Sequence, residues 1–143
     1  MLVRDIMSKD VACVKADDSI ERAAQLMKQH DVGSIPVCKQ DRVVGIVTDR
    51  DITLRCVAEG QDTKKQSVSD IMSINPTVGS PDMNVQDAVK LMSQNQIRRL
   101  PIVGDDNLVG IVALGDISLE PTLQDNAEWA LKDISKPNSD KFF

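Results

Sequence analysis

The sequence predicts an α/β (α+β) fold built from two tandem β-α-β-β-α repeats, and two observations support this. Residues Val3–Leu54 align with Val68–Leu119 without a gap, and about a third of the paired positions are identical. In each copy an apolar, strand-like run leads into a polar segment typical of a helix start, at Val43–Ile52 and again at Leu108–Ile117. A single copy buries too little surface to be stable alone. We therefore expect the two copies to pack as one module around a pseudo-twofold axis.

The first half of each repeat is predicted to be a short strand followed by an amphipathic helix. In the first copy a helical turn at Val3–Met7 precedes a strand at Ala12–Val14 and a helix that runs to His30. Ser19 aligns with Asn84, and both are preferred N-cap residues, which places the start of this helix in each copy. The apolar stripe has helical spacing and consists of Ile20, Ala23, Ala24 and Met27, repeated as Val85, Ala88, Val89 and Met92.

The second half of each repeat is predicted to be a hairpin followed by a second helix. The strands Ile35–Cys38 and Leu100–Val103 each contain a proline, which indicates a strand start or an edge strand. Polar turns, at residues 40–42 in the first copy and 104–107 in the second, reverse the chain into the apolar run named above. In the first copy a helix is expected at Asp49–Glu59, and Gly60 should end it.

A further helix is predicted after the second copy, at Pro121–Ile134, and Ser135–Phe143 is expected to be frayed. Trp129 should pack this helix onto the module, with a dimer contact as the alternative. The expected organisation is a first repeat at 1–60, a polar linker at 61–67, a second repeat at 68–120, and the helix and tail at 121–143. The predicted apolar members of the last helix are Leu123, Ala127, Ala130, Leu131 and Ile134.

Composition argues against several classes of protein. The 143 residues are 41% hydrophobic and 27% charged, with a net charge of −5, which disfavours nucleic acid as a partner. No apolar run approaches the roughly 18 residues that a membrane span needs, and Met1–Asp5 is too short and acidic to open a secretory signal. Three widely spaced cysteines disfavour a disulfide scaffold and a metal site. We expect a cytoplasmic protein with no metal.

Three stretches carry a family resemblance. Met7-Ser8, the Ile35-Pro36-Val37 strand and Gly45–Ile52 resemble the cystathionine-β-synthase (CBS) domain, here as a tandem pair, or Bateman module, of the stand-alone bacterial or archaeal type. The resemblance covers Val3 to about Leu119. It implies two repeats packed through their sheets, two clefts between them, and pairing into flat dimers. Family members commonly bind AMP, ADP, ATP, S-adenosylmethionine or NAD there, and mostly act as regulatory sensors.

The resemblance also implies roles for individual residues. Asp51 and Asp116 would accept hydrogen bonds from ribose hydroxyls, and Thr48 would lie near the phosphate; the stretches before each first strand and before each proline strand, including Val32-Gly33, would line the adenine slot. Each cleft would draw on both copies. One would combine Thr48 and Asp51 with Asn75, Pro76, Thr77 and Ile97. The other would combine Asp116 with Asp10, Val11, Ala12, Val32, Arg98 and Arg99.

The two clefts should differ, because the second copy has Ala113 where the first has Thr48, and Arg98-Arg99 where the first has Gly33-Ser34. Arginine suits bidentate recognition of phosphate. Our hypothesis is that a ligand binds better at the Thr48/Asp51 cleft, with Arg98 or Arg99 reaching its phosphates. Two other interpretations stay open: Thr48 and Asp51 also have the spacing of a helix capping box, and the arginines could be solvated or paired with acids.

These observations predict a regulatory adenine-nucleotide sensor of the AMP, ADP or ATP type, without catalytic activity. The nucleotide would be a regulatory ligand rather than a required cofactor, and the partners would be a second copy in a homodimer and a separate effector protein. Catalysis is disfavoured because the sequence has a single histidine, His30, no P-loop and no recognisable catalytic set. The alternatives are a sensor of S-adenosylmethionine or NAD(H), or a ligand-free scaffold with degenerate sites, which Ala113 favours.

Overall fold

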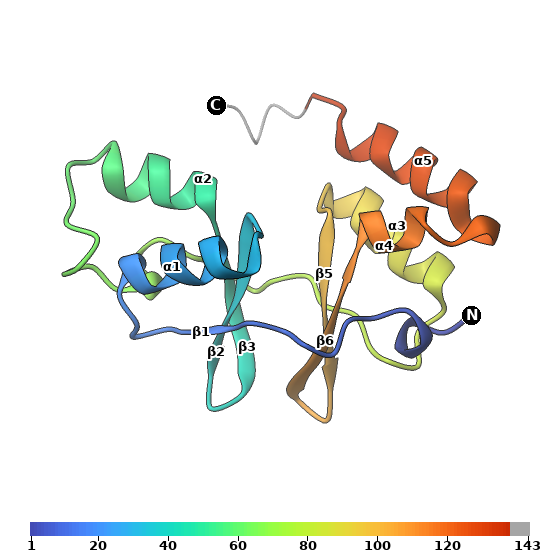
Figure 1. The fold of residues 1–143 in the computed structure, drawn as a ribbon, viewed down its shortest axis with the longest axis horizontal. Coiled ribbons are helices and arrows are strands. Elements are labelled where there is room, and N and C mark those ends of the chain that lie inside the picture. The colour runs from blue at the N-terminus through green and yellow to red at the C-terminus, as the bar shows by residue number, and fades with distance from the viewer. Residues whose placement is uncertain (138–143) are drawn as a thin grey trace. The chain divides into compact units, whose positions relative to one another are not determined.

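The computed structural model describes residues 1–137, which form two compact units (Figure 1). Unit 1 comprises Met1–Lys9, Thr77–Ile102 and the described residues from Gly110 onward, and unit 2 comprises Asp10–Pro76 and Val103–Val109. Each unit contains most of one sequence repeat. The strands and helices follow one another in the predicted order, but the first strand is Val14–Lys15 rather than Ala12–Val14, and in the second copy it is a single bridge at Gly79. Part of the predicted frayed tail, residues 138–143, lies outside the described residues.

Each unit takes its opening turn from the other sequence copy. In unit 1 the Val3 N–H donates to the Met83 carbonyl (2.8 Å) and the Val85 N–H donates to the Met1 carbonyl (3.0 Å). In unit 2 the Val68 N–H donates to the Asp18 carbonyl in the same way (2.9 Å). Val3 and Val68 are both fully buried. The opening turn of one copy therefore completes the core around the helix of the other.

Unit 2 is built on a four-stranded sheet in the order β1-β2-β3-β4, in which β1 runs parallel to β2 and the other neighbours are antiparallel. Helix α1 starts at a Ser19 hydroxyl that accepts a hydrogen bond from the Arg22 N–H (3.1 Å), as the sequence predicts. The elements are β1 (Val14–Lys15), α1 (Ile20–His30), β2 (Ser34–Lys39), β3 (Arg42–Thr48), α2 (Asp49–Asp51), η2 (Ile52–Val57), η3 (Val68–Asp70) and β4 (Ser73–Ile74).

Unit 1 repeats this arrangement around residues 99–102 and 110–113 of the β5–β6 hairpin, whose tip, Val103–Val109, belongs to unit 2. Single bridges from Gly79 to Ile102 and from Ser8 to Ile111 take the places of β1 and β4. Asn84 occupies the N-cap position of α3, but its side chain forms no capping hydrogen bond. The elements are η1 (Val3–Asp5), α3 (Val85–Asn95), β5 (Arg99–Gly104), β6 (Asn107–Ala113), α4 (Leu114–Ser118), η4 (Pro121–Leu123) and α5 (Gln124–Ile134).

Helix α5 packs against both α3 and α4 and changes which residues of unit 1 are buried. Val89 of α3 is buried, whereas Ala24, its counterpart on α1, is exposed and Leu26 is buried instead. The prediction that Ala24 is part of the core was therefore wrong. The buried face of α1 includes Ala23, Leu26 and Met27 and excludes Ala24. Among the described residues, unit 2 has no helix equivalent to α5.

Three predictions about the helices need correction. The segment after Asp51 is a π-helix rather than a continuing α-helix, because the Ala58 N–H donates to the Thr53 carbonyl five residues earlier (2.9 Å). The Thr53 hydroxyl donates to the Asp49 carbonyl (3.1 Å). Gly60, with φ 69°, follows the helix end as predicted. Trp129 is 55% exposed, so it does not pack α5 onto the unit. Leu131 is also exposed, and the buried residues of the last helical segment are Leu123, Ala127 and Ala130.

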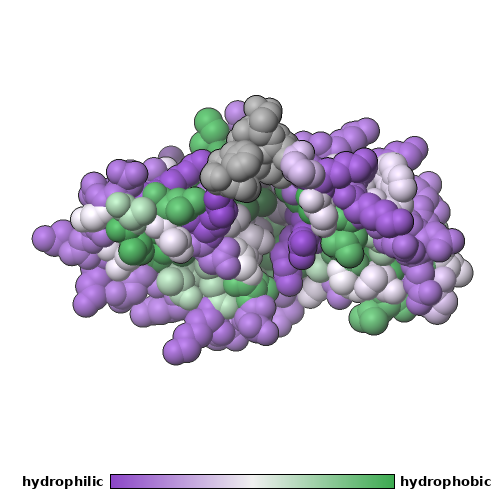
Figure 2. Space-filling view, turned by 90° about the horizontal axis from the view of Figure 1, so that it is seen from above, coloured by the Kyte–Doolittle hydropathy of each residue, from purple (hydrophilic) through white to green (hydrophobic). Residues whose placement is uncertain are grey.

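The surface seen in Figure 2 is mostly hydrophilic, with hydrophobic residues in separate small groups. No helix in the described part of the chain is both long enough and apolar enough to cross a membrane.

Candidate functional site

Each unit has one corner at which a strand leads into a helix, and both corners are built in the same way. At the first corner β3 leads into α2, and the Asp49 N–H donates to the Gly33 carbonyl (2.9 Å). At the second corner β6 leads into α4, and the Leu114 N–H donates to the Arg98 carbonyl (2.8 Å). The residue that precedes each proline strand therefore lies beside the corner of its own unit. This contact places Arg98 next to the helix that carries Asp116.

The first corner is closed by a capping box. The Thr48 hydroxyl accepts a hydrogen bond from the Asp51 N–H (3.0 Å), and the Asp51 carboxylate accepts one from the Thr48 N–H (2.9 Å). Arg55 Nε lies 3.7 Å from the second carboxylate oxygen of Asp51, and the Asp51 side chain is only 15% exposed. The capping interpretation of Thr48 and Asp51 is therefore confirmed, and the polar atoms proposed for ligand contact already have partners.

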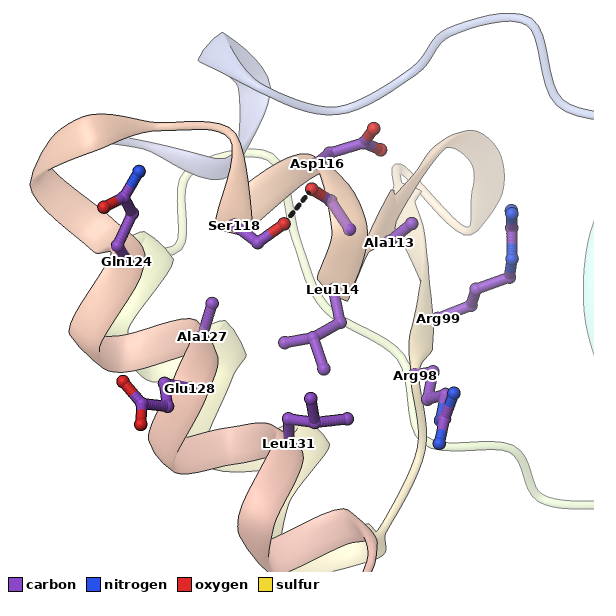
Figure 3. Close-up of a pocket in the computed structure, with 11 residues that line it drawn as sticks. Arg98, Arg99, Ala113, Leu114, Asp116, Ser118, Gln124, Ala127, Glu128 and Leu131 are labelled. Atoms are coloured by element: carbon purple, nitrogen blue, oxygen red, sulfur yellow. Dashed lines mark hydrogen bonds between the residues drawn. The ribbon is translucent and has the colours of Figure 1, made fainter.

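The second corner has no such cap. Ala113 has the extended backbone of an N-cap residue but no side-chain acceptor. Asp116 is exposed, and within residues 1–137 no group forms a hydrogen bond or an ion pair with its carboxylate. The Ser118 hydroxyl at this corner donates to the Gly115 carbonyl (2.6 Å; Figure 3) and leaves Asp116 untouched. The Asp116 carboxylate is thus available to a ligand.

A pocket of about 610 Å³ lies at the second corner, entirely within unit 1 (Figure 3). Leu114, Ala127 and Leu131 form its apolar part between α4 and α5, while Arg98 and Arg99 lie on the strand side and Asp116 at one end. This volume and this mixture of apolar and charged groups are typical of a small-molecule site. The complete lining is Arg98, Arg99, Ala113, Leu114, Gly115, Asp116, Ser118, Gln124, Ala127, Glu128 and Leu131.

The structure brings together some of the predicted site residues. Arg98, Arg99 and Asp116 line one pocket. Gly33 lies against the first corner, where an added Cβ would be 3.2 Å from an Asp49 carboxylate oxygen. Of the remaining predicted residues, unit 1 contains Thr77 and Ile97, and unit 2 contains Asp10, Val11, Ala12, Val32, Asn75 and Pro76. The two mixed clefts thus draw on both units and stay a prediction.

The contribution of α5 to the pocket was not predicted from the sequence. Gln124, Glu128 and Leu131 all line it. Their spacing of i, i+4 and i+7 places them on one face of the helix. The sequence shows this spacing, but nothing in it distinguishes Gln124 and Glu128 from the polar residues of an ordinary solvent-exposed helix face.

Comparison with known proteins identifies the family. The CBS domain model matches residues 3–57 and again residues 68–120. The chain belongs to the CBS domain family. The predicted tandem pair and its mixed α+β fold are therefore confirmed. In the described part of the chain no group of three or more His, Cys, Asp or Glu side chains is placed to hold a metal ion.

Three CBS proteins illustrate the similarity. The CBS domain-containing protein YhcV of Bacillus subtilis (strain 168) is 49% identical, over 95% of this chain and 96% of its own length. Hypoxic response protein 1 of Mycobacterium tuberculosis is 34% identical, over 80% of this chain and 81% of its own length. A crystal structure of Hypoxic Response Protein I with two coordinated zinc ions, also 34% identical, matches with a TM-score of 0.77 over 82% of this chain and 97% of that one. The CBS domain pair of protein MJ0100, crystallised with 5′-methylthioadenosine and S-adenosyl-L-methionine, is 31% identical with a TM-score of 0.71 over 82% of this chain and 93% of that one.

Proposed function

We propose that this CBS domain pair is a regulatory, non-catalytic module that binds an adenine nucleotide of the AMP, ADP or ATP type in the pocket of unit 1. The observation that supports this most is the grouping of Arg98, Arg99 and Asp116 around one pocket. The structure of the MJ0100 domain pair supports the adenosine part of the proposal, because that relative was crystallised with two adenosine derivatives.

In this proposal Asp116, Arg98 and Arg99 contact different parts of the nucleotide. The ionised Asp116 carboxylate accepts hydrogen bonds from the two ribose hydroxyls, and charge-assisted hydrogen bonds of this kind are roughly twice as strong as neutral ones. The guanidinium groups of Arg98 and Arg99 bind the phosphates. Leu114 and Leu131 offer apolar contact to the base. Because arginine attracts anions, phosphate-bearing ligands are favoured over the cationic sulfonium of S-adenosylmethionine.

This assignment reverses the preference that the sequence suggested. The corner at Thr48 and Asp51 becomes the weaker site, since its hydroxyl and its carboxylate are engaged with the backbone and with Arg55. A ligand there would have to share acceptors with the capping box. At the second corner a ligand would displace no such interaction, because Asp116 has no partner among the described residues.

Regulation follows if the nucleotide binds one arrangement of the protein more tightly than another. We include in the proposal a cytoplasmic homodimer and a separate effector protein that reads the change. Light scattering with and without nucleotide measures the oligomeric state. A monomer under both conditions would remove the dimer from the proposal while leaving the pocket assignment intact.

The nucleotide assignment is tested by a thermal-shift panel of AMP, ADP, ATP, S-adenosylmethionine and NADH. A ligand at about 100 times its Kd should stabilise the fold by roughly 2.7 kcal/mol. Asp116→Asn, and the double variant Arg98→Ala with Arg99→Ala, should each weaken binding of the preferred nucleotide at least about tenfold, or about 1.4 kcal/mol. The matched control, Arg22→Ala with Lys28→Ala, removes two exposed cations from α1 and should bind as the parent does.

Three other results would change the conclusion. No shift with any ligand supports the ligand-free scaffold. A shift with S-adenosylmethionine or NADH alone supports those sensors instead. Unchanged affinity in both pocket variants places the ligand elsewhere, and loss of affinity in Asp51→Asn would then point back to the first corner.

A further inference from the structure

Two cysteines of unit 2 lie on neighbouring segments: Cys38 is in β2, and Cys13 directly precedes β1, the strand that pairs with β2. Strand β1 pairs in parallel with β2, and Lys15 is the partner of Cys38 in this register. Cys13 comes immediately before β1 and two residues before Lys15. Successive side chains of a strand alternate between its two faces, so the alternation of β1, continued by one residue, places Cys13 diagonally across from Cys38.

The two thiols are close enough to affect one another and differ in accessibility. Cys13 is exposed, whereas Cys38 is only 5% exposed. Burial raises the pKa of the Cys38 thiol to about 12, with further contributions from the neighbouring Cys13 thiol and the Asp41 carboxylate. All three cysteines are free. An accessible thiol thus lies beside a buried one that is held in its protonated form.

The third cysteine and the second repeat provide internal comparisons. Cys56 is fully buried, and its thiol donates to the Gln61 carbonyl with a sulfur–oxygen distance of 3.7 Å. In the second repeat the positions of Cys13 and Cys38 are occupied by Val78 and Val103. The pair of thiols is therefore a feature of one repeat and not a requirement of the fold.

We propose that Cys13 and Cys38 form a redox-active dithiol that a low-molecular-weight disulfide converts into an intramolecular disulfide. This proposal is independent of the proposed function. It assigns the first step to Cys13, since only this thiol is exposed to a reagent in solution. It assigns the second step to Cys38, which lies next to Cys13 and cannot easily be reached by the reagent.

The reaction is two successive thiol–disulfide exchanges. The Cys13 thiolate attacks one sulfur of the small disulfide, an S–S bond of the protein with half of the reagent forms, and the other half leaves as a thiol. Cys38 then loses its proton to solvent, and its sulfur attacks the Cys13 sulfur and expels the second small thiol. The protein loses two electrons and two protons, and these reduce the reagent to two thiols. The high pKa of Cys38 makes the second exchange the slower one.

The test uses the reduced 143-residue chain incubated with oxidised glutathione. Free thiols are then alkylated in denaturant, and intact-mass and peptide analysis identify the state of each cysteine. The parent should contain a Cys13–Cys38 disulfide, no glutathione adduct and an alkylated Cys56. Cys56→Ala is the matched control and should give the same disulfide.

Two variants separate the steps. Cys13→Ser should leave Cys38 and Cys56 as free thiols. Cys38→Val, which introduces the residue found at this position in the second repeat, should stop at a mixed disulfide between Cys13 and glutathione. The proposal is overturned if the parent itself stops at that mixed disulfide, if Cys13 pairs with Cys13 of another chain, or if Cys38 is oxidised in the Cys13→Ser variant.

Discussion

The two strand-to-helix corners occupy the same place in the repeat and are stabilised in different ways. At the first corner Thr48 and Asp51 exchange two hydrogen bonds, and within residues 1–137 no further helix packs beside α2 in the way that α5 packs beside α4. At the second corner Ala113 supplies no cap, and α5 packs against α4 instead. The first corner uses its polar side chains to stabilise the fold. The second gains stability from packing and leaves the Asp116 carboxylate exposed for binding.

The same contrast extends to the long helix of each unit. Ser93 of α3 is 4% exposed although it aligns with Lys28, an exposed residue of α1. Packing of α5 against α3 accounts for this difference, because it adds a second covered face to α3. The C-terminal helix is therefore both a wall of the pocket and a part of the core of unit 1. Its removal or displacement should affect both properties.

The largest expected effect comes from disrupting this packing. Ala130 of α5 is fully buried, so Ala130→Asp would place a charge in the core and should cost about 3 kcal/mol or more of unfolding free energy. Urea denaturation, monitored by circular dichroism, measures this loss of unfolding free energy. Trp129→Ser is the control on the exposed side of the helix and should change stability by less than about 0.5 kcal/mol. A loss below about 1 kcal/mol in Ala130→Asp would show that α5 does not stabilise unit 1.

A second effect distinguishes the repeats at alkaline pH. Cys38 has a pKa of about 12 in the folded protein and an ordinary value of 9.0, whereas Val103 at the equivalent position does not ionise. The unfolded chain therefore releases this proton from about pH 9 upward while the folded chain keeps it, so stability is full below pH 9 and falls as the pH rises toward 12. At about pH 10.5 the loss should be on the order of 2 kcal/mol.

Urea denaturation under reducing conditions, at a series of pH values from about 8 to 11, measures this loss. Other groups also titrate in this range, so the quantity to compare is the difference between the parent and Cys38→Val. The variant should lose less stability than the parent as the pH rises. Parallel pH profiles for the two proteins would show that the Cys38 thiol does not contribute.

A third, smaller effect compares the caps directly. Thr48→Ala removes the acceptor of the Asp51 N–H and should cost about 1 kcal/mol of stability. Asp116→Asn removes no interaction formed among the described residues and should stay within about 0.5 kcal/mol of the parent. Thermal unfolding of both variants without ligand provides the comparison. Equal losses in the two variants would mean that Asp116 also stabilises its corner.

Much of the fold could be predicted because the repeat supplies each element twice. Ser19 marks the start of α1 and aligns with Asn84, so two independent sequences agree on one boundary. The exchange of opening turns between the copies could not be predicted. The hydrogen bonds from Val3 to Met83 and from Val68 to Asp18 join residues far apart in sequence, and no local pattern distinguishes them from contacts within one copy.

The candidate site was only partly predictable for a related reason. Arg98, Arg99 and Asp116 could be proposed from the alignment of the two copies together with the family resemblance, and they do line one pocket. Gln124 and Glu128 lie outside the repeated region, so neither the alignment nor the resemblance included them. The spacing from Thr48 to Asp51 is compatible with a helix cap and also with a ligand contact. The position of the Thr48 hydroxyl distinguishes the two roles, and the sequence does not give that position.

Restoring the missing cap at the second corner should have the smallest effect on stability. Ala113 has φ −102° and ψ 145°, close to the φ −116° and ψ 162° of Thr48, so threonine fits the backbone there. Ala113→Thr should let the new hydroxyl accept a hydrogen bond from the Asp116 N–H and raise the unfolding free energy by about 0.5 kcal/mol, at the lower end of measured cap effects. If the Asp116 carboxylate then turns to the backbone N–H of the introduced threonine, as Asp51 does to Thr48, nucleotide affinity should fall while stability rises. Opposite changes in these two quantities, measured by thermal unfolding and by calorimetric titration, would support the idea that a polar corner residue serves either the fold or the ligand. A rise in both would refute it.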